Sequence, residues 1–234
     1  MKPLAIITGG TKGIGLAIAQ KFAAEGFDLL INARSANDLS QTKNKIESSF
    51  GNHCEIFQAD LSKKNEAKAF CEFALSLERP IQVLVNNTGT FVQGSLMQET
   101  DEALETQINT NLYSAYWVTK GLIQTIKESP NSHIFNICSI ASLQAYPSSG
   151  SYTVSKFALL GFSKSLREEL KDDGVKVTSI MPGATYTSSW EGIDLPKSRF
   201  IQSEDIAEIT WTAYSLSSAA LVEDIVIRPL AGDI

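Results

Sequence analysis

The sequence contains few residues of the kinds that bind metals or form disulfides. Its 234 residues include three cysteines and two histidines. Cys54, Cys71 and Cys138 are odd in number and lack paired metal-ligand spacing, and only His53 and His133 could join them as imidazole ligands. We therefore expect no metal site, and reduced thiols in a cytoplasmic protein.

The chain also lacks a long hydrophobic run and an excess of basic charge. No apolar stretch approaches the ~20 residues that cross a bilayer, and the first strand-like run begins too early to leave room for a signal peptide. Lys and Arg number 20 against 26 Asp and Glu, which gives a formal net charge of −6. We therefore expect neither a nucleic acid nor a membrane as a partner.

Short apolar runs rich in β-branched residues alternate with longer stretches of helical period. This alternation is typical of repeated strand and helix units on a parallel sheet. It predicts an α/β fold, with one domain over residues 1–234 and a doubly wound, seven-stranded parallel sheet covered by helices on both faces. The predicted strands are Leu4–Thr8, Asp28–Ala33, Cys54–Gln58, Ile81–Asn86, His133–Ser139, Val175–Met181 and Asp224–Arg228. The predicted helices begin near Gly13, Asn37, Lys63, Thr100, Ser151 and Ser203.

One irregular stretch, Thr187–Gln202, follows the sixth strand and contains Trp190, Gly192 and Pro196. Ligands of a doubly wound sheet bind beyond the carboxyl ends of the strands. The position of this stretch therefore predicts a substrate loop at about residues 187–202, and the alternative is a tolerated surface insertion.

A glycine-rich turn connects the first strand to the first helix, with the sequence Thr8-Gly9-Gly10-Thr11-Lys12-Gly13-Ile14-Gly15. Glycines let a backbone approach a pyrophosphate, whose charge is met by free N–H groups at the helix N-terminus. The turn therefore predicts phosphate binding. Its spacing is Gly-x-x-x-Gly-x-Gly, which differs from the Gly-x-Gly-x-x-Gly dinucleotide fingerprint.

The end of the second strand carries a cation where NAD-binding folds have an acid. An acidic residue about 20 residues past the glycines accepts hydrogen bonds from the ribose hydroxyls of NAD, but here Arg34 follows Ala33. A guanidinium fits a 2′-phosphate, and Lys12 in the glycine turn adds a second cation. Together they favour NADP(H) over NAD(H), and the alternative is that both are solvated surface cations.

Tyr152 and Lys156 form a Tyr-x-x-x-Lys pair at the start of a predicted helix. Side chains four residues apart share a helix face, and an ammonium beside a phenol favours the phenolate. Ser139 lies at the carboxyl end of the preceding strand. Its hydroxyl could hydrogen-bond a substrate carbonyl and hold it against the phenol.

These motifs resemble the short-chain dehydrogenase/reductase family in kind and in order, over nearly the whole chain. The matching residues are Thr8–Gly15, Asn86-Asn87-Thr88-Gly89, Asn111, Ser139, Tyr152 with Lys156, and Pro182-Gly183 followed by Thr187. The resemblance implies a Rossmann-type fold and hydride transfer between a nicotinamide ring and a carbonyl or alcohol carbon.

The resemblance also implies the role of each catalytic residue. Tyr152 is the general acid in reduction, Lys156 binds the nicotinamide ribose and depresses the pKa of the tyrosine, and Ser139 orients the carbonyl. Asn111 holds a water in the proton relay. An asparagine inside the predicted helical stretch Thr100–Lys127 is a poor helix former and indicates a local kink. Asn109 competes for this role, and only the match of Thr110-Asn111-Leu112 to the family pattern selects Asn111.

By the same comparison, further residues lie along the cofactor. Asp60 contacts the adenine, and Thr88 stands where the family usually has alanine. The full set of implied cofactor contacts is Gly9, Thr11, Lys12, Gly13, Ile14, Gly15, Arg34, Asp60, Leu61, Asn87, Thr88, Gly89, Tyr152, Lys156, Pro182, Gly183, Thr185 and Thr187.

The leading hypothesis is an NADPH-dependent reductase of small ketones or aldehydes. A 3-oxoacyl-acyl-carrier-protein reductase is the alternative, although no cluster of Lys and Arg is apparent near the expected mouth of the site. A catalytically silent NADP(H)-binding sensor is disfavoured because Asn111, Ser139, Tyr152 and Lys156 are all present. Family members commonly form homodimers or homotetramers, which is therefore expected here. His53 and His133 match no catalytic position and are interpreted as structural.

Overall fold

In residues 2–187 and 194–233, which the computed structural model describes, seven parallel strands form one sheet. The order across the sheet is β3-β2-β1-β4-β5-β6-β7. The strands are β1 (Leu4–Thr8), β2 (Asp28–Ala33), β3 (Cys54–Gln58), β4 (Ile81–Asn86), β5 (His133–Ile137), β6 (Lys176–Pro182) and β7 (Asp224–Ile227). From β1 to β3 the strands are added toward one edge of the sheet, and from β4 to β7 they are added toward the other edge. The fold is therefore doubly wound, as predicted.

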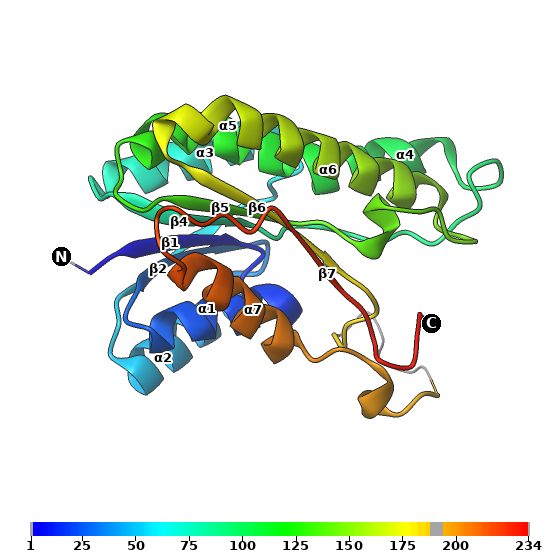
Figure 1. The fold of residues 1–234 in the computed structure, drawn as a ribbon, viewed down its shortest axis with the longest axis horizontal. Coiled ribbons are helices and arrows are strands. Elements are labelled where there is room, and N and C mark those ends of the chain that lie inside the picture. Colours follow the sequence, from blue (N-terminus) through cyan, green and yellow to red (C-terminus); the bar gives the residue numbers. More distant parts are fainter. Residues whose placement is uncertain (1, 188–193, 234) are drawn as a thin grey trace.

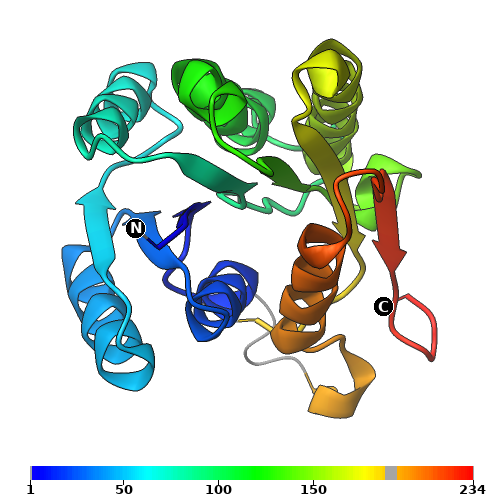
Figure 2. The ribbon, with the colours of Figure 1, turned by 60° about the vertical axis from the view of Figure 1, so that its left-hand side comes forward.

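Helices cover both faces of the sheet. Figures 1 and 2 show α3, α5 and α6 on one face and α1, α2 and α7 on the other. The helices are α1 (Gly13–Ala24), α2 (Ala36–Phe50), α3 (Lys64–Ser76), α4 (Asp101–Ile108), α5 (Ser114–Lys127), α6 (Gly150–Leu170) and α7 (Ser203–Ser215). Short 3₁₀ turns lie at Ile140–Ser142, Lys171–Asp173 and Lys197–Arg199. The predicted α/β fold class is confirmed.

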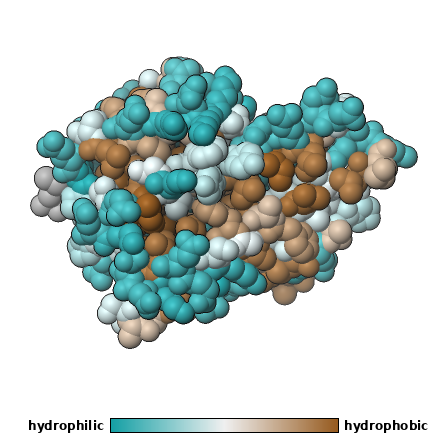
Figure 3. Space-filling model, turned by 90° about the horizontal axis from the view of Figure 1, so that it is seen from above, coloured by the Kyte–Doolittle hydropathy of each residue, from teal (hydrophilic) through white to brown (hydrophobic). Residues whose placement is uncertain are grey.

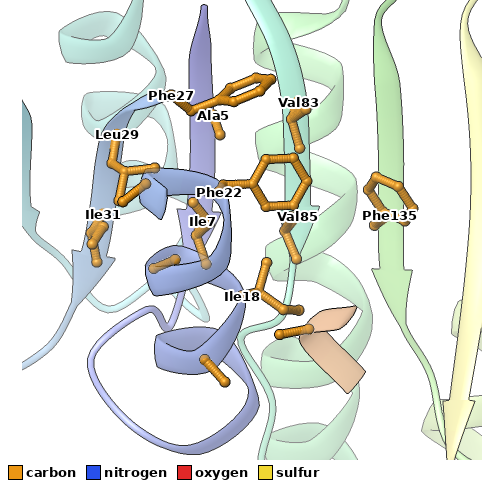
Figure 4. Close-up of a cluster of buried hydrophobic side chains, with 14 of the residues drawn as sticks. Ala5, Ile7, Ile18, Phe22, Phe27, Leu29, Ile31, Val83, Val85 and Phe135 are labelled. Atoms are coloured by element: carbon orange, nitrogen blue, oxygen red, sulfur yellow. The ribbon is translucent and has the colours of Figure 1, made fainter. Parts of the chain in front are cut away.

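Each face of the sheet has its own hydrophobic core, because successive side chains of a strand point to opposite faces. Ile7 of β1 packs with Ile18 and Phe22 of α1 on one side. Figure 4 shows these two α1 side chains pointing toward Val85 of β4. On the other side, Ile6 belongs to a cluster of buried side chains from α3 and α5. Burial on both faces explains why inner strands such as β1 and β4 lack polar alternation.

One predicted strand ends two residues early, and a predicted helix kink is present. The predicted strand His133–Ser139 ends at Ile137, because Ser139 instead caps the turn Ile140–Ser142, with its Oγ accepting a hydrogen bond from Ala141 N at 3.1 Å. The predicted kink near Asn111 is present as a π-helix over Asn109–Tyr113, between α4 and α5. Single π turns are frequent at functional sites.

The buried histidine of β5 makes the stability of the protein sensitive to pH. His133 is 1% exposed and its Nε2 lies 2.7 Å from Thr178 Oγ1. Thr178 donates its own proton to Val222 O, so Nε2–H of His133 is the donor to Thr178. Burial lowers the pKa of His133 from 6.5 to about 3, and Lys176 adds to this.

Between pH 6.5 and about pH 3, His133 is protonated in the unfolded chain and neutral in the folded protein. Stability therefore falls by about 1.4 kcal/mol for each pH unit below 6.5. Urea unfolding should show about 2 kcal/mol less stability at about pH 5 than at neutral pH from this residue, and His133→Phe should lack that part of the loss. The exposed His53 provides the control, His53→Gln. Equal pH dependence in wild type and His133→Phe would contradict this assignment.

Candidate active site

The loops that follow β4, β5 and β6 leave the sheet at the same edge as the glycine turn after β1. Figure 1 shows them together at the right-hand end of the molecule. Parallel strands share one direction, so their carboxyl ends converge there. The sequence-predicted catalytic and phosphate-binding residues are thereby brought to one edge of the sheet.

The glycine turn approaches the loop after β6. Gly9 and Gly13 have φ of +63° and +52°, a conformation that favours glycine. A Cβ at Gly13 would lie 2.9 Å from Thr187 Cγ2. Thr187 therefore stands directly against the turn, as expected for two segments that share a ligand. Thr11 lies between these two glycines, and Ile14, the second residue of α1, packs on the core.

Side chains from β1 and the loop after β4 hold the glycine turn in shape. Asn87 Nδ2 donates to Thr8 O and to Gly9 O, both at 3.0 Å. In return, Thr8 Oγ1 accepts from the backbone N of Asn87 at 2.9 Å and of Thr88 at 3.1 Å. The Asn87 side chain thus holds the backbone of the glycine turn in place. A Cβ at Gly15 would collide with this side chain.

Thr88, the departure from the family pattern, has an unused hydroxyl. Its Oγ1 is buried and has no hydrogen-bond partner among the described residues. A Cβ at Gly9 would lie 3.4 Å from this oxygen, so the hydroxyl faces the glycine turn. A buried polar atom without a partner is rare, and a bound ligand on the turn is a natural partner for it.

The two cations predicted for a 2′-phosphate lie on neighbouring loops. Lys12 precedes α1, and its Nζ lies 2.8 Å from Asp38 Oδ2 in the first turn of α2. Arg34 follows β2, and its guanidinium-bearing side chain is exposed. The Lys12–Asp38 pair therefore ties the glycine turn to the helix that begins just after Arg34.

The residues after β3 form a tight turn. Asp60 Oδ1 accepts from Ser62 N at 3.1 Å and from Ser62 Oγ at 2.7 Å. These hydrogen bonds fix the turn that leads into α3. Leu61 is 1% exposed and belongs to the core beside Phe70. The Leu61 side chain therefore packs inward, and only its backbone is available for a cofactor contact.

Tyr152 and Lys156 lie on the first turns of α6, facing the loop after β4. Lys156 Nζ lies 5.8 Å from the centre of the Tyr152 ring and donates to Ile137 O at 2.9 Å. A Cβ at Gly89 would lie 3.6 Å from that Nζ. Lys156 is 5% exposed, and an ammonium has three protons to donate, so two of them have no acceptor among the described residues and remain for a ligand beside Gly89.

Asn111 ties three elements together from inside the π-helix. Its Oδ1 accepts from Thr90 N at 2.7 Å, and its Nδ2 donates to Thr90 O at 3.0 Å and to Ser155 Oγ at 2.8 Å. Ser155 Oγ in turn donates to Tyr152 O at 2.7 Å. The Asn111 amide protons are thus both used within the protein. Asn109, the competing asparagine, begins the π-helix, whereas Asn111 is its buried residue.

Ser139 offers a hydroxyl proton at the end of β5. Its Oγ accepts from Ala141 N at 3.1 Å, and its backbone N donates to Ser142 Oγ at 3.3 Å. Oγ donates to no acceptor among the described residues, so its own proton is left for a ligand. Cys138, the preceding residue, points into the core with Met181 and Leu159, and burial raises the pKa of its thiol to about 12.

The loop after β6 is held by the neighbouring edge strand. Gly183 N donates to Ile227 O at 2.8 Å, directly after Pro182. Thr185 Oγ1 donates to Gly183 O at 3.0 Å, and Thr185 pairs with Ile201 in an isolated bridge. Residues 188–193 of the predicted substrate loop, including Trp190 and Gly192, lie outside the described residues.

A model of the family described as short chain dehydrogenase matches residues 3–197. The chain belongs to the short-chain dehydrogenase family. Two of its curated relatives are reductases. It is 32% identical to a sepiapterin reductase of Chlorobaculum tepidum, over 100% of this chain and 99% of the relative. It is 33% identical to a 3-oxoacyl-acyl-carrier-protein reductase of Chlamydia trachomatis serovar D, over 81% of this chain and 77% of the relative.

The structure of this short-chain dehydrogenase is also similar to that of L-sorbose reductase from Gluconobacter frateurii, which was solved with NADPH and L-sorbose. The TM-score is 0.91 and the sequence identity is 26%, over 97% of this chain and 95% of the other. Among the described residues, no helix has the length and apolar character of a membrane span. In that same part of the chain, no three His, Cys, Asp or Glu side chains cluster as metal ligands do.

The residues of this short-chain dehydrogenase fit a nicotinamide dinucleotide. The glycine turn precedes a helix N-terminus, the Thr88 hydroxyl faces it without a partner among the described residues, and a missing Cβ at Gly89 leaves room beside Lys156. These features lie directly after β1, directly after β4 and on α6, so one extended ligand along the sheet edge would contact all of them.

Sequence reasoning did not assign several side chains that build the site. Ser155 and Thr8 organise Tyr152 and the glycine turn through hydrogen bonds, and Phe91 lies against Tyr152 with ring centres 4.9 Å apart. Ser155 lies within the Tyr-x-x-x-Lys motif, so its position in the sequence could have indicated a role beside Tyr152. No sequence pattern indicates the contact of Phe91 with Tyr152, because this contact depends on how the loop after β4 folds.

Proposed function

We propose that this protein is an NADPH-dependent oxidoreductase that transfers a hydride to the carbonyl of a small ketone or aldehyde, and in reverse oxidises the alcohol. The observation that carries the proposal is the position of Lys156. Its ammonium lies between the Tyr152 ring, at 5.8 Å, and the open side of Gly89. One cation can there hold a ribose and lie beside the reacting phenol.

When bound, NADPH supplies the hydride. Tyr152 donates its phenolic proton to the carbonyl oxygen as that oxygen gains negative charge. Ser139 donates its free hydroxyl proton to the same oxygen and fixes its direction. Asn111 fastens the first turn of α6 through Ser155, at 2.8 Å. The proposed catalytic residues are therefore Ser139, Tyr152 and Lys156, and the proposed role of Asn111 is to position them.

The preference for NADP(H) over NAD(H) rests on Arg34 and Lys12. A guanidinium and a phosphate form charge-assisted, paired hydrogen bonds. Asp38 offsets the charge of Lys12 at 2.8 Å, so Arg34 carries most of the preference. The likeness to L-sorbose reductase, solved with NADPH at a TM-score of 0.91, supports the same coenzyme.

A small, uncharged substrate suits the segments around Tyr152. Residues 90–100 and 143–149 contain no Lys or Arg. They expose apolar side chains instead: Phe91 is 52%, Leu96 52% and Leu143 45% exposed. The alternative, a 3-oxoacyl-acyl-carrier-protein reductase, is favoured by the 33% identity to the Chlamydia enzyme. An acidic carrier, however, needs cations near the site.

The proposed setting is that of a single domain, with residues 187–202 as the substrate loop, in the cytoplasm. The three cysteines are free and buried, which suits a reducing compartment. Figure 3 shows apolar surface over the face that carries α4, α5 and α6. Its exposed members include Leu104, Tyr113, Val154 and Phe157. A patch of this kind marks an interaction site, and we propose a second copy of the chain as its partner, in a homodimer or homotetramer.

The test is consumption of NADPH, followed by absorbance beside NADH, over aldehydes, diketones, a pterin ketone, L-sorbose and an acetoacetyl thioester. Turnover of a small carbonyl compound with NADPH is expected. Turnover of the thioester alone would replace the proposal by the acyl-carrier alternative. Tight binding of NADPH without turnover of any carbonyl would favour the sensor.

A further inference from the structure

Helix α6, which carries Tyr152, begins without a cap from its own residues. Its N-cap residue, Ser149, makes no side-chain hydrogen bond to the first-turn N–H groups in the part of the chain that the structure describes. Ser149 Oγ instead donates to Tyr146 O at 2.7 Å. The first N–H groups of a helix have no partners within the helix, so those of α6 depend on another segment.

That segment is the loop between β4 and α4. Gly150 N donates to Gly94 O at 3.0 Å. Ser151 N donates to Glu99 Oε2 at 3.4 Å, and Ser151 Oγ donates to Glu99 Oε1. A carboxylate at a helix N-terminus also meets the positive end of the helix dipole. Glu99 therefore supplies, from 52 residues away, the cap that Ser149 does not.

Two glycines leave room for this contact. A Cβ at Gly94 would lie 2.8 Å from Glu99 Cβ, and a Cβ at Gly150 would lie 2.7 Å from the backbone of Leu96. Both distances are shorter than packed carbon atoms allow. The loop therefore lies directly on the first turn of α6 at three points, and Glu99 is its charged contact.

The fastened loop also carries an aromatic wall. Phe91 lies with its ring centre 4.9 Å from that of Tyr152, at an interplanar angle of 79°. Phe91 is 52% exposed, so its ring borders the place where a substrate meets the Tyr152 phenol. Tyr152 follows Ser151 directly in the chain. One carboxylate thus restrains the reacting phenol from the helix side and the wall beside it from the loop side.

We propose that Glu99 is a positioning residue, which caps α6 in trans and thereby holds Tyr152 and the Phe91 wall in their reacting arrangement. Its effect on turnover rests on the proposed function, but its effect on α6 does not. The two are tested separately.

The first measurement is hydrogen exchange of the amides at Gly150–Thr153 in the protein without cofactor. Glu99→Ala should speed this exchange by about tenfold, because the first turn opens locally. Glu99→Gln keeps an acceptor oxygen and should fall between Glu99→Ala and the wild type. Glu102→Gln, which removes an exposed acid of α4, should change nothing. Unaltered exchange in Glu99→Ala would overturn the proposal, whatever the protein catalyses.

The second measurement is steady-state kinetics with the best carbonyl substrate, below the melting temperature of every variant. Glu99→Ala should lower kcat/KM by about tenfold, since small misplacements of reacting groups cost this much or more. The Kd for NADPH should stay within about twofold, because Glu99 does not touch the glycine turn. Ser151→Ala combined with Glu99→Ala should cost no more than Glu99→Ala alone.

Additive losses in the double variant would overturn the proposal, as would an equal loss in Glu102→Gln. If the wild type reduces no carbonyl, the proposed function fails, while the exchange measurement still decides the role of Glu99.

Discussion

Tyr152→Phe should lower kcat by about 10³-fold while NADPH still binds. Removal of the phenolic oxygen leaves no group to protonate the carbonyl oxygen, and general acid catalysis contributes about 10²–10⁴-fold. The ring remains packed edge-on against Phe91 at 4.9 Å, so the fold of the first turn of α6 should survive. Stopped-flow or steady-state consumption of NADPH measures the loss, and fluorescence titration measures the binding.

Tyr116→Phe is the matched control for this change. Tyr116 lies on α5, and its hydroxyl accepts only from Lys120 at 3.3 Å among the described residues. It should retain wild-type turnover. A Tyr152→Phe variant that keeps more than about a tenth of wild-type kcat would exclude Tyr152 as the proton donor.

Arg34→Asp should reverse the coenzyme preference, with the ratio of kcat/KM for NADPH to that for NADH falling by about 100-fold or more. The variant loses a charge-assisted contact to the 2′-phosphate of about 2–3 kcal/mol. It also gains a carboxylate that repels the phosphate and can accept hydrogen bonds from the ribose hydroxyls of NADH. Initial rates with each coenzyme, at fixed substrate, give the ratio.

Lys45→Asp separates this local effect from a change in overall charge. Lys45 is an exposed cation on α2, the helix that begins after Arg34. The Lys45→Asp substitution alters the net charge by the same two units as Arg34→Asp, but it should leave the coenzyme ratio within about twofold of wild type. An unchanged ratio in Arg34→Asp would mean that the 2′-phosphate binds elsewhere.

The sequence was sufficient to predict the sheet because the inner strands are buried on both faces. Runs such as Val83-Leu84-Val85 have no polar alternation, and this pattern directly encodes a covered parallel sheet. The strand ends were less readable. His133–Ser139 continues as an apolar run, but the Ser139 hydroxyl competes for the backbone and starts a turn two residues after the ladder ends.

The candidate site was predicted as a set of residues, and less well as a set of contacts. Tyr152, Lys156, Ser139 and Asn111 fall on adjoining elements at one sheet edge, as their motifs indicated. The sequence did not reveal that both Asn111 amide protons are used by Thr90 and Ser155. Partners 21 and 44 residues away are set by tertiary packing, which local patterns do not encode.

The same reason hid the role of Glu99. Next to Thr100 and ahead of α4, it resembles an ordinary acid at the start of its own helix. Its carboxylate instead caps α6 through Ser151, on a different element. Only the folded path of the loop after β4 brings the two together.

Transfer of deuterium from 4,4-dideuterated NADPH to a carbonyl substrate tests the central claim most directly. Mass spectrometry should find one deuterium on the former carbonyl carbon of the alcohol made by the wild type, and Tyr152→Phe should form this labelled alcohol about 10³-fold more slowly. An alcohol formed without deuterium, or equal rates of labelled alcohol formation by both proteins, would contradict hydride transfer assisted by Tyr152.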